Sequence, residues 1–443
     1  MGNVNSIPVV ECPQLIRSYC DGFKDRLEAN NGYRCFVALV CASVFGEANL
    51  SMIVRYFLFS PSVSALSRFL NTEDLAPNLN RRHRLRLKAI FLKVDKDPRR
   101  YQYALDDTFI PHSGKNIWGV YTWYDHTKKC CVKAHKLLVL GLVDQKRKLF
   151  IPIIWEILHR DLSKLTDAPT NEDLTHEKAW EIGLRFLDAV DEFGLPKLTV
   201  AADSWFFGND FCDGIVSRGF NYVIEVRSNL KVRKHGKKSI DTPLSKFFMA
   251  KERRVIRWQK KSKFVAESVV TLSEIPSSIK VVAVANHREI DEEVFGYYAC
   301  NQLTWDASKI WGYSRGRWSI EVQFRELKQL FALGGAAVRS KQSVETEVSI
   351  SMIALTVIRL EQLADADSNK NQYAQPNSAG NIVRKLEINS VSQSILKLAM
   401  QPKPSVVSKF RLRYTRENLN SKPAERSRKK EIPTDKGKLA KSA

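Results

Sequence analysis

The sequence predicts an α/β protein in which helices flank a mixed β-sheet. Apolar residues recur at helical spacing up to about residue 95 and at strand-like spacing from about residue 100. The runs at 134–144 and 148–157 are long and almost continuously apolar, and a short turn joins them, as in adjacent buried strands. Helical and strand patterns then alternate over 172–227. A meander followed by this alternation predicts one sheet that is partly antiparallel and partly parallel.

Residues 1–97 are predicted to form a helical N-terminal DNA-binding domain. Apolar runs at 33–46 and 49–59 and capping serines at the start of 60–70 indicate short helices, and 81–91 is a strongly basic helix. Basic faces on a small helical domain suit DNA binding. A helical packing domain with solvated arginines explains the same pattern equally well.

Residues 98–227 are the first part of the expected α/β core. Its predicted elements are, in order, strands at 101–110, 134–144 and 148–157, a helix at 172–193, a strand at 197–206, a helix at 209–218 and a strand at 221–227. Residues 228–300 are rich in Val, Arg and Lys and predict a β-rich insertion subdomain. Residues 301–370 are the second part of the core and are mainly helical. Residues 371–443 are predicted to be a basic C-terminal region that is partly disordered.

The charge of the chain predicts a polyanionic partner. The 443 residues are enough for two or three domains, and the 44% hydrophobic content supports a real core. The 70 Lys and Arg exceed the 48 Asp and Glu, which gives a net charge of +22. Residues 403–443 hold 13 Lys or Arg and 4 Asp or Glu, so +9 of that charge lies there. Because Lys and Arg release counterions when they neutralise phosphates, nucleic acid is the simplest partner.

Cysteine usage and hydropathy predict a cytoplasmic protein. The eight cysteines form no C-x-x-C pair and no zinc-finger spacing with histidine, so we expect reduced thiols. The first 30 residues are polar with scattered charges, unlike a signal peptide. No apolar stretch is long enough to span a membrane.

Three acidic residues are candidates for a metal site. Asp106, beside Asp107, lies near the end of the first core strand, and Asp203 ends the fourth. Glu321 lies on a late helix whose other face is apolar. Residues at strand ends face the crevice in which α/β sheets bind ligands. Carboxylates gathered there provide the oxygen ligands that Mg²⁺ prefers, and two ions about 3.5–4 Å apart can clamp both oxygens of a phosphodiester reaction.

Each of these acids also has an ordinary structural explanation. An aspartate at a strand end is most often a turn residue. Glu321 can form an i,i+4 ion pair with Arg317 or Arg325, which stabilises an isolated helix by only a few tenths of a kcal/mol. Residue by residue these explanations are favoured, and only the combination of the three acids favours a site.

The motifs around the acids resemble those of DDE transposases from bacterial insertion sequences, most closely the insertion-sequence-four group. The stretches that carry the resemblance are "DDT" at 106–108, "ADSWFFG" at 202–208 and "RWSIEVQFRELK" at 317–328. The last motif of that group is a spaced Tyr, Arg, Glu and Lys, and Arg317, Glu321 and Lys328 match its spacing. Tyr313 stands one residue too early. The similarity covers roughly residues 60–370 and includes a long β-rich insertion before the glutamate.

The resemblance implies an RNase H-like catalytic core and a metal-dependent activity on DNA. Asp106, Asp203 and Glu321 would bind two Mg²⁺ ions, with Mn²⁺ as a substitute. The enzyme would cut one strand at a transposon end, and the freed 3′-hydroxyl would attack a second phosphodiester by in-line transesterification. On the pattern Asp-x-Thr the family's first ligand maps to Asp106. Because strand neighbours point to opposite faces, Asp107 is then directed away.

The resemblance also implies partners. Arg317 and Lys328 lie one turn before and two turns after Glu321 and are expected to hold DNA phosphates. Arg325 lies on the same helix face and is expected to do the same. Tyr313 is the tyrosine of the motif, one residue before its usual position, and is also expected at the DNA. The expected partners are the double-stranded DNA of transposon terminal repeats and of the target, and a second copy in a homodimer. No membrane partner is expected, and a bacterial nucleoid-associated location follows.

Two other functions fit parts of the same pattern. A catalytically silent, domesticated DNA-binding protein would keep the fold without the chemistry, although intact acids argue against it. An RNase H-like nuclease would cut strands but never join them. A two-carboxylate glycosidase is disfavoured by the positive charge of the chain and by the cations around Glu321.

Overall fold

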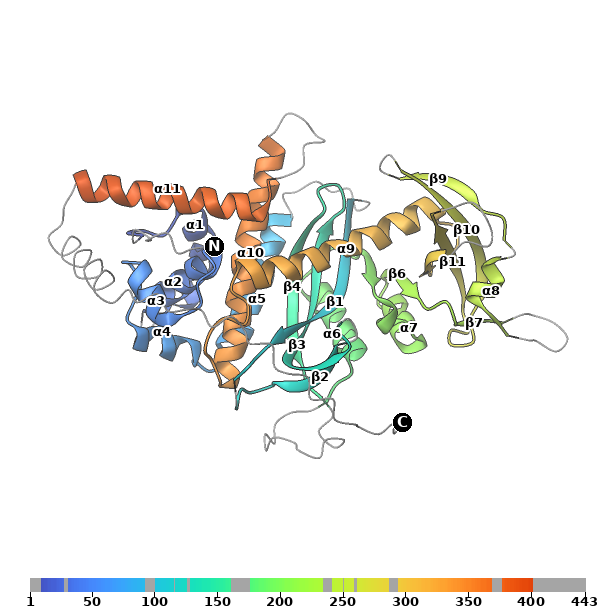
Figure 1. Ribbon diagram of the computed structural model, residues 1–443, viewed down its shortest axis with the longest axis horizontal. Coiled ribbons are helices and arrows are strands. Elements are labelled where there is room, and N and C mark those ends of the chain that lie inside the picture. The colour runs from blue at the N-terminus through green and yellow to red at the C-terminus, as the bar shows by residue number, and fades with distance from the viewer. Residues whose placement is uncertain are drawn as a thin grey trace.

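A computed structural model describes the arrangement of most of the chain (Figure 1). It describes residues 9–27, 31–91, 100–114, 116–125, 128–160, 176–233, 241–249, 251–258, 261–286, 294–368 and 377–400. Helices occupy one end of the molecule, a large sheet its middle, and further strands the opposite end.

The N-terminal region is helical, as predicted. Its helices are α1 (Gln14–Cys20), the 3-10 helix η1 (Asp21–Arg26), α2 (Gly32–Val44), α3 (Leu50–Tyr56), α4 (Val63–Leu70) and α5 (Leu75–Phe91). Two of them begin at side-chain caps: Asn49 accepts hydrogen bonds from the backbone at the start of α3, and Ser62 does so for α4. Helix α2 is buried along almost its whole length, so it is the centre of this helical region.

The middle of the molecule is a mixed sheet with the predicted order of strands and helices. The elements are β1 (Tyr101–Pro111), β2 (Tyr121–Asp125), β3 (Cys130–Asp144), β4 (Leu149–Leu158), α6 (Ala179–Glu192), β5 (Thr199–Ala202), the 3-10 helix η5 (Ser204–Phe206), α7 (Asn209–Ser217) and β6 (Asn221–Val226). Strand β3 pairs antiparallel with both β1 and β4, whereas β5 lies parallel to β1 and β6 parallel to β5. The order β4-β3-β1-β5-β6 is therefore antiparallel on one side and parallel on the other, consistent with the expected RNase H-like class.

The sheet separates two cores because alternate residues of each strand point to opposite faces. On β3, Leu137 and Val139 pack in the core shared with the N-terminal helices, while Leu138 and Leu140 pack in the core under α6 and α7. The near-continuous apolar run that predicted β3 is thus explained by burial on both faces. Strand β2 was missing from the prediction, since its alternating pattern is short and half exposed.

The β-rich insertion extends the same sheet. Its elements are β7 (Lys231–Val232), β8 (Thr242–Pro243), α8 (Leu244–Met249), β9 (Arg254–Trp258), β10 (Lys261–Thr271), β11 (Ser278–Ala285) and β12 (Val294–Cys300). Strand β12 pairs antiparallel with β6, and β11, β10 and β9 follow outward, so ten strands of the described chain form one sheet. The expected β-rich character is present: β9, β10, β11 and β12 continue the central sheet, whereas β7 and β8 form a separate two-stranded sheet.

Three long helices complete the described chain: α9 (Ala307–Leu330), α10 (Lys341–Ser368) and α11 (Ala379–Met400). Helix α9 crosses the sheet from α10 towards the strands of the insertion (Figure 1) and contacts β1, β3, β5 and β6. One apolar core runs from Val9 through α9 and α10 to Ile382, so the N-terminal helices and the late helices share it. Within the part expected to be basic and partly disordered, 379–400 is helical, and 401–443 lies outside the described residues.

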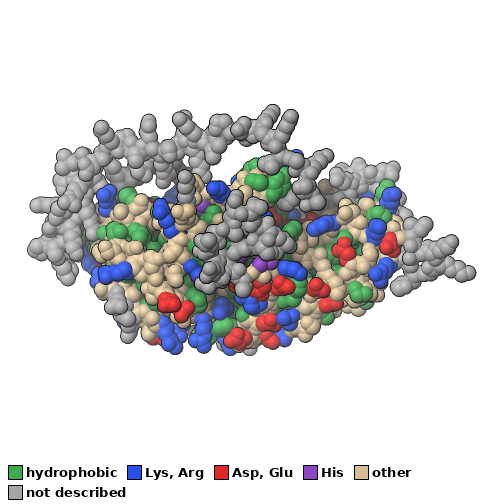
Figure 2. Space-filling model, turned by 90° about the horizontal axis from the view of Figure 1, so that it is seen from below, with side chains coloured by type: hydrophobic (Ala, Val, Ile, Leu, Met, Phe, Trp, Pro, Cys, Tyr) green, Lys and Arg blue, Asp and Glu red, His purple; other side chains and the backbone are tan. Residues whose placement is uncertain are grey.

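The described helices include none that is both long and apolar enough to cross a membrane. Lys and Arg side chains occur from one end to the other of the face shown in Figure 2, as the high net charge of the chain leads one to expect.

Candidate active site

The first two predicted acids lie side by side because of the register of β1 and β5. Leu105 of β1 is paired with Ala202 of β5, so the next residues along the two parallel strands, Asp106 and Asp203, are neighbours. Asp203 then caps η5, where its carboxylate accepts a hydrogen bond from the backbone amide of Ser204. The buried strand β5 thus ends directly before Asp203, so the carboxylate lies at the end of that strand.

Asp106 and Asp107 point to opposite faces of the sheet, as strand alternation predicts. The Oδ2 atom of Asp106 accepts a hydrogen bond of 2.8 Å from the guanidinium of Arg317 on α9. Asp107 instead forms an ion pair of 3.0 Å with Lys136 of β3. Asp106 is therefore the member of the pair that faces Glu321's helix.

Helix α9 brings the third acid to this edge of the sheet. Its first turn is capped by Asp306, and the predicted apolar stripe is buried at Ile320, Phe324 and Leu327. Gly316 sits where a Cβ atom would come within 2.5 Å of the Gln102 side chain of β1, so the glycine permits close packing of the helix on the strand. The apolar stripe and this close packing together direct the neighbouring face of α9 at the acids.

Arg317 lies at the centre of the acids. Its guanidinium is 2.8 Å from Asp106, 3.2 Å from Glu321 and 3.9 Å from Glu225 of β6. The i,i+4 ion pair that offered the ordinary explanation of Glu321 is therefore present, and the same arginine also joins Glu321 to Asp106. The side chain of Arg317 is only 13% exposed and is paired with carboxylates, and its expected contact with DNA phosphates stays a prediction.

The other predicted DNA-contacting residues have different environments. Lys328 donates a hydrogen bond of 2.7 Å to the hydroxyl of Thr108, and Arg325 is exposed to solvent. Tyr313 is buried and its ring stacks on Trp305 at 5.2 Å between centroids. Tyr313 thus lies in the apolar core beneath α9, and its predicted contact with DNA stays a prediction.

The charges at the site shift the pKa values of its carboxyl groups. Burial is the main reason why the pKa of Asp106 is raised to about 7; Arg317 opposes the shift, and the charges of Asp107 and Asp203 contribute to it. Burial also raises the pKa of Asp107, although Lys136 opposes the shift. It raises the pKa of Glu225 as well, and there Arg317 opposes the shift. The cluster is thus a place where negative charge is costly in the absence of further cations.

The donor set suits a hard divalent cation, although the acids do not surround one as they stand. Arg317 brings one positive charge against the four negative charges of Asp106, Asp203, Glu225 and Glu321, all of which interact with it electrostatically. Carboxylate oxygens are the ligands that Mg²⁺ prefers. Within the described ranges no three Asp, Glu, His or Cys side chains are close enough together to hold an ion, and the guanidinium occupies one oxygen of Asp106.

Two residues of the site were absent from the prediction. Glu225 follows the register of the sheet: Ala202 pairs with Ile224, so Glu225 lies beside Asp203 just as Asp203 lies beside Asp106. Its position as the acid inside the buried run "NYVIEV" was a usable signal. Lys136 is surrounded by the rings of Phe109, Trp123 and Trp205 at 5.2–5.6 Å, and only the tertiary structure assembles that set.

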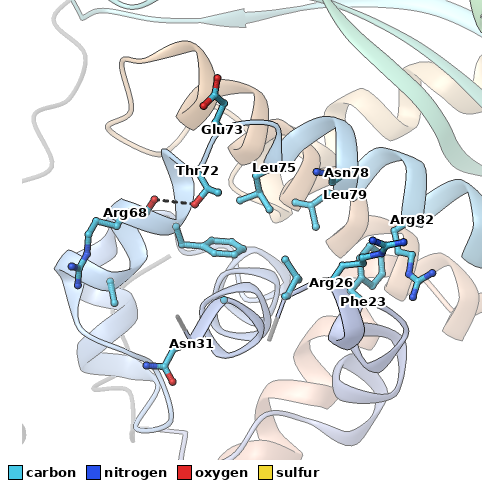
Figure 3. A pocket seen from close by; sticks show the side chains of 14 residues that line it. Phe23, Arg26, Asn31, Arg68, Thr72, Glu73, Leu75, Asn78, Leu79 and Arg82 are labelled. Atoms are coloured by element: carbon cyan, nitrogen blue, oxygen red, sulfur yellow. Dashed lines mark hydrogen bonds between the residues drawn. The ribbon is translucent and has the colours of Figure 1, made fainter. Parts of the chain in front are cut away.

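A concavity lies among the N-terminal helices, apart from the acidic residues of the candidate active site (Figure 3). It has a volume of about 700 Å³, with Phe23, Leu75 and Leu79 among its apolar lining residues and Arg68 and Arg82 among its basic ones. Arg82 donates a hydrogen bond of 2.9 Å to the carbonyl of Gly22 and pairs with Asp25, so it is held in place. Arginine side chains on the wall of an apolar hollow fit the predicted basic faces of this region.

A family model matches part of the chain. Residues 59–270 match the family model described as DDE superfamily endonuclease. That stretch contains Asp106, Asp203 and Glu225, whereas Glu321 lies beyond it. Among solved structures the chain is similar to a piggyBac transposase in a cryo-EM synaptic complex with hairpin DNA, with 11% identity, a TM-score of 0.41, and coverage of 88% of this chain and 76% of that chain. No curated protein matches the sequence.

Proposed function

We propose that the chain is a DNA transposase that uses Asp106, Asp203 and Glu321 for metal-dependent phosphodiester chemistry. The observation that carries the proposal is the convergence of these acids around Arg317, although they come from three elements separated by long stretches of sequence. The match of residues 59–270 to DDE superfamily endonucleases supports a nuclease class for the part that holds the two aspartates.

The carboxylates would hold two Mg²⁺ ions, with Mn²⁺ as a substitute, and these ions would supply Lewis-acid activation of the scissile phosphate and of its nucleophile. The chain's own residues then orient the reaction. Asp106 and Asp203 are fixed by strand register, and Glu321 by the packing of α9 on β1. In-line displacement requires a fixed geometry of the reacting groups, which residues on packed strands and helices can provide.

DNA recognition is proposed for the basic surfaces around the site. Arg325 is exposed on α9, and Lys328 lies two turns after Glu321. The helical N-terminal region, with Arg26 and Arg68 beside its concavity, is proposed to bind the terminal repeats. Target DNA and a second copy of the chain, which would pair two transposon ends, are the further proposed partners.

The test is cleavage and joining of a DNA fragment that carries the sequences flanking the gene. Wild-type protein should nick this DNA at the repeat end with Mg²⁺ or Mn²⁺ and then join the freed 3′ end to a second duplex. Asp106→Asn, Asp203→Asn and Glu321→Gln should each bind the DNA and lose cleavage by at least about 10²-fold. Asp188→Asn is the matched control, because Asp188 is also paired with an arginine but lies on α6. Full cleavage by Glu321→Gln would sink the assignment of the third acid.

A catalytically silent DNA-binding protein has one observation in its favour. Arg317 already neutralises part of the charge of Asp106 and Glu321, as it would in a site that had ceased to bind ions. DNA binding by the wild type without any cleavage in Mg²⁺ or Mn²⁺ would select this function. Cleavage without joining would select a plain nuclease.

A further inference from the structure

Glu225 is a fourth carboxylate at the site, and it belongs to the same row as the two aspartates. The parallel register of β1, β5 and β6 places Asp106, Asp203 and Glu225 on adjacent strands at one level of the sheet. On its other side Glu225 is paired with the buried Tyr298 of β12. The strand therefore holds Glu225 at a fixed place beside Arg317.

The distances from Arg317 to its acids are unequal. It lies 2.8 Å from Asp106 and 3.2 Å from Glu321, but 3.9 Å from Glu225, which is too long for a hydrogen bond. Both oxygens of Asp106 already have a partner, since Oδ1 accepts a hydrogen bond from the backbone amide of Asp107 and Oδ2 one from Arg317. Asp106 can present an oxygen to a cation only if the guanidinium gives way.

Glu225 is a nearby alternative partner for the guanidinium of Arg317. Moving from 3.9 Å to the ~2.8 Å of a charge-assisted hydrogen bond would bring it onto Glu225, a displacement of about 1 Å. The side chain of Glu225 is 37% exposed, compared with 16% for Asp106, so the movement leads to a more exposed carboxylate. A like-charged guanidinium and a divalent cation cannot share Asp106 without mutual repulsion, whereas Glu225 accepts the arginine at a distance from that carboxylate.

We propose that Glu225 is a positioning residue that receives Arg317 when a divalent cation enters the site, so that Asp106 and Glu321 are released as ligands. Arg317 thereby serves as a resident counter-ion that is exchanged for metal, and Glu225 keeps it beside the reacting phosphate. The inference rests on the proposed metal-dependent function, and it assigns to Glu225 a role distinct from that of a metal ligand.

The test is a double-mutant cycle on Mn²⁺ affinity, measured on the full chain by electron paramagnetic resonance of free Mn²⁺ in the absence of DNA. Glu225→Gln should weaken Mn²⁺ binding by about three- to tenfold, because Arg317 then remains on Asp106 and Glu321. Arg317→Gln should bind Mn²⁺ at least as tightly as the wild type. In the Arg317→Gln background, adding Glu225→Gln should change the affinity by less than about twofold.

The matched control is Glu156→Gln. Glu156 has the same 37% exposure as Glu225 and is also paired with an arginine, but its partner is Arg185 of α6. This variant should bind Mn²⁺ as the wild type does. Arg317→Lys provides a second background should Arg317→Gln fail to fold, since a lysine cannot bridge two carboxylates with a planar fork. In the Arg317→Lys background too, Glu225→Gln should weaken Mn²⁺ binding less than it does in the wild type.

The possible outcomes distinguish the role of Glu225 from the proposed metal-dependent function. Equal weakening by Glu225→Gln in both backgrounds would show Glu225 to be a direct ligand and would overturn this inference while leaving the proposed function standing. No effect of Glu225→Gln in either background would also overturn it. Absence of any Mn²⁺ binding by the wild type would overturn the proposed metal-dependent function, and this inference with it.

Discussion

At the scale of single residues, the site is governed by the balance between one guanidinium and several carboxylates. Arg317 is paired with Asp106 and Glu321 and lies near Glu225, and its side chain is less exposed than those of the two glutamates. Burial alone would lower the pKa of Arg317, but the surrounding acids together raise it above its ordinary value, so the arginine keeps its charge. The protonation that varies is therefore that of the carboxyl groups.

The pKa of Asp106, which burial raises to about 7, predicts that the stability of the metal-free protein depends on pH. A carboxyl group with a higher pKa in the folded state than its value of about 3.9 in the unfolded chain favours folding while it is protonated. That contribution is fully present below about pH 4 and is lost as the pH rises through about 7. Between these limits the wild type should lose more free energy of unfolding than Asp106→Asn, by about 1.4 kcal/mol for each unit of pKa difference.

The measurement is urea unfolding with EDTA at several pH values across that window. If the wild type and Asp106→Asn lose the same free energy of unfolding over it, Asp106 does not titrate in this range, and the prediction is wrong.

At the scale of elements, packing decides where the acids lie. Helix α9 is held against α10 by Arg359, which is buried, pairs with Glu326 and donates a hydrogen bond of 3.0 Å to Gln323. Its apolar stripe faces the shared core, so its rotation about its own axis is fixed. The direction of Glu321 and Arg317 follows from that rotation.

Removing an apolar side chain of this stripe should destabilise the protein. Leu327 is fully buried, so Leu327→Ala should lower the free energy of unfolding by about 2–5 kcal/mol through reduced burial and the cavity that remains. Arg325→Ala on the exposed face of the same helix should change it by no more than about 0.5 kcal/mol. Chemical denaturation monitored by circular dichroism compares the two, and similar effects of both variants would contradict the assigned rotation of α9.

The close pairing of β3 and β4 predicts that a side chain at Gly141 destabilises the protein. A Cβ atom at Gly141 would lie 2.2 Å from the ring of Phe150 and 2.6 Å from the carbonyl oxygen of Ile151, at a point where the register of the two strands shifts. Gly141→Ala should therefore cost about 1–3 kcal/mol of stability or more. At Gly208 a Cβ would meet nothing within 4 Å, so Gly208→Ala should cost at most about 1 kcal/mol, from a poorer helix cap. Thermal unfolding of both variants tests this, and equal melting temperatures would refute it.

At the scale of the whole molecule, one sheet and one shared core link segments that the sequence pattern separates. The core of the N-terminal helices continues through α9 and α10, and the insertion strands extend the central sheet through β12. Lys and Arg side chains occur along the length of the face shown in Figure 2, and residues 403–443 carry +9 of the net charge. Binding of DNA should therefore depend steeply on salt.

The logarithm of the DNA association constant should fall linearly with the logarithm of salt concentration, with a slope that reports the number of phosphates neutralised. Replacing Arg426, Arg428, Lys429 and Lys430 by Gln in the full chain should reduce that slope by about 0.9 for each phosphate that these side chains neutralise in the wild type. Fluorescence anisotropy with labelled DNA at several salt concentrations measures it. Arg218→Gln is the control, because Arg218 is already paired with Asp188. An unchanged slope in the fourfold variant would exclude these residues from the interface.

The sequence by itself determined the local elements and the candidate acids of this protein. Alternating and helical periodicities predicted β1, β3, β4, β5, β6 and most helices, because these patterns record which side of each element is buried. Short motifs were enough to single out Asp106, Asp203 and Glu321. The resemblance to the Asp-x-Thr pattern favoured Asp106 over Asp107, and strand alternation allowed only one of the two to face the site.

Only the tertiary structure decided how these parts combine. The pairing of β12 with β6 joins residues far apart in the sequence, and it makes the insertion part of the central sheet. The proximity of Arg317 to Asp106 and Glu225, and the burial of Tyr313, likewise depend on how α9 lies across β1 and β6. Such arrangements arise from long-range register and helix packing, and no local pattern of residues specifies them.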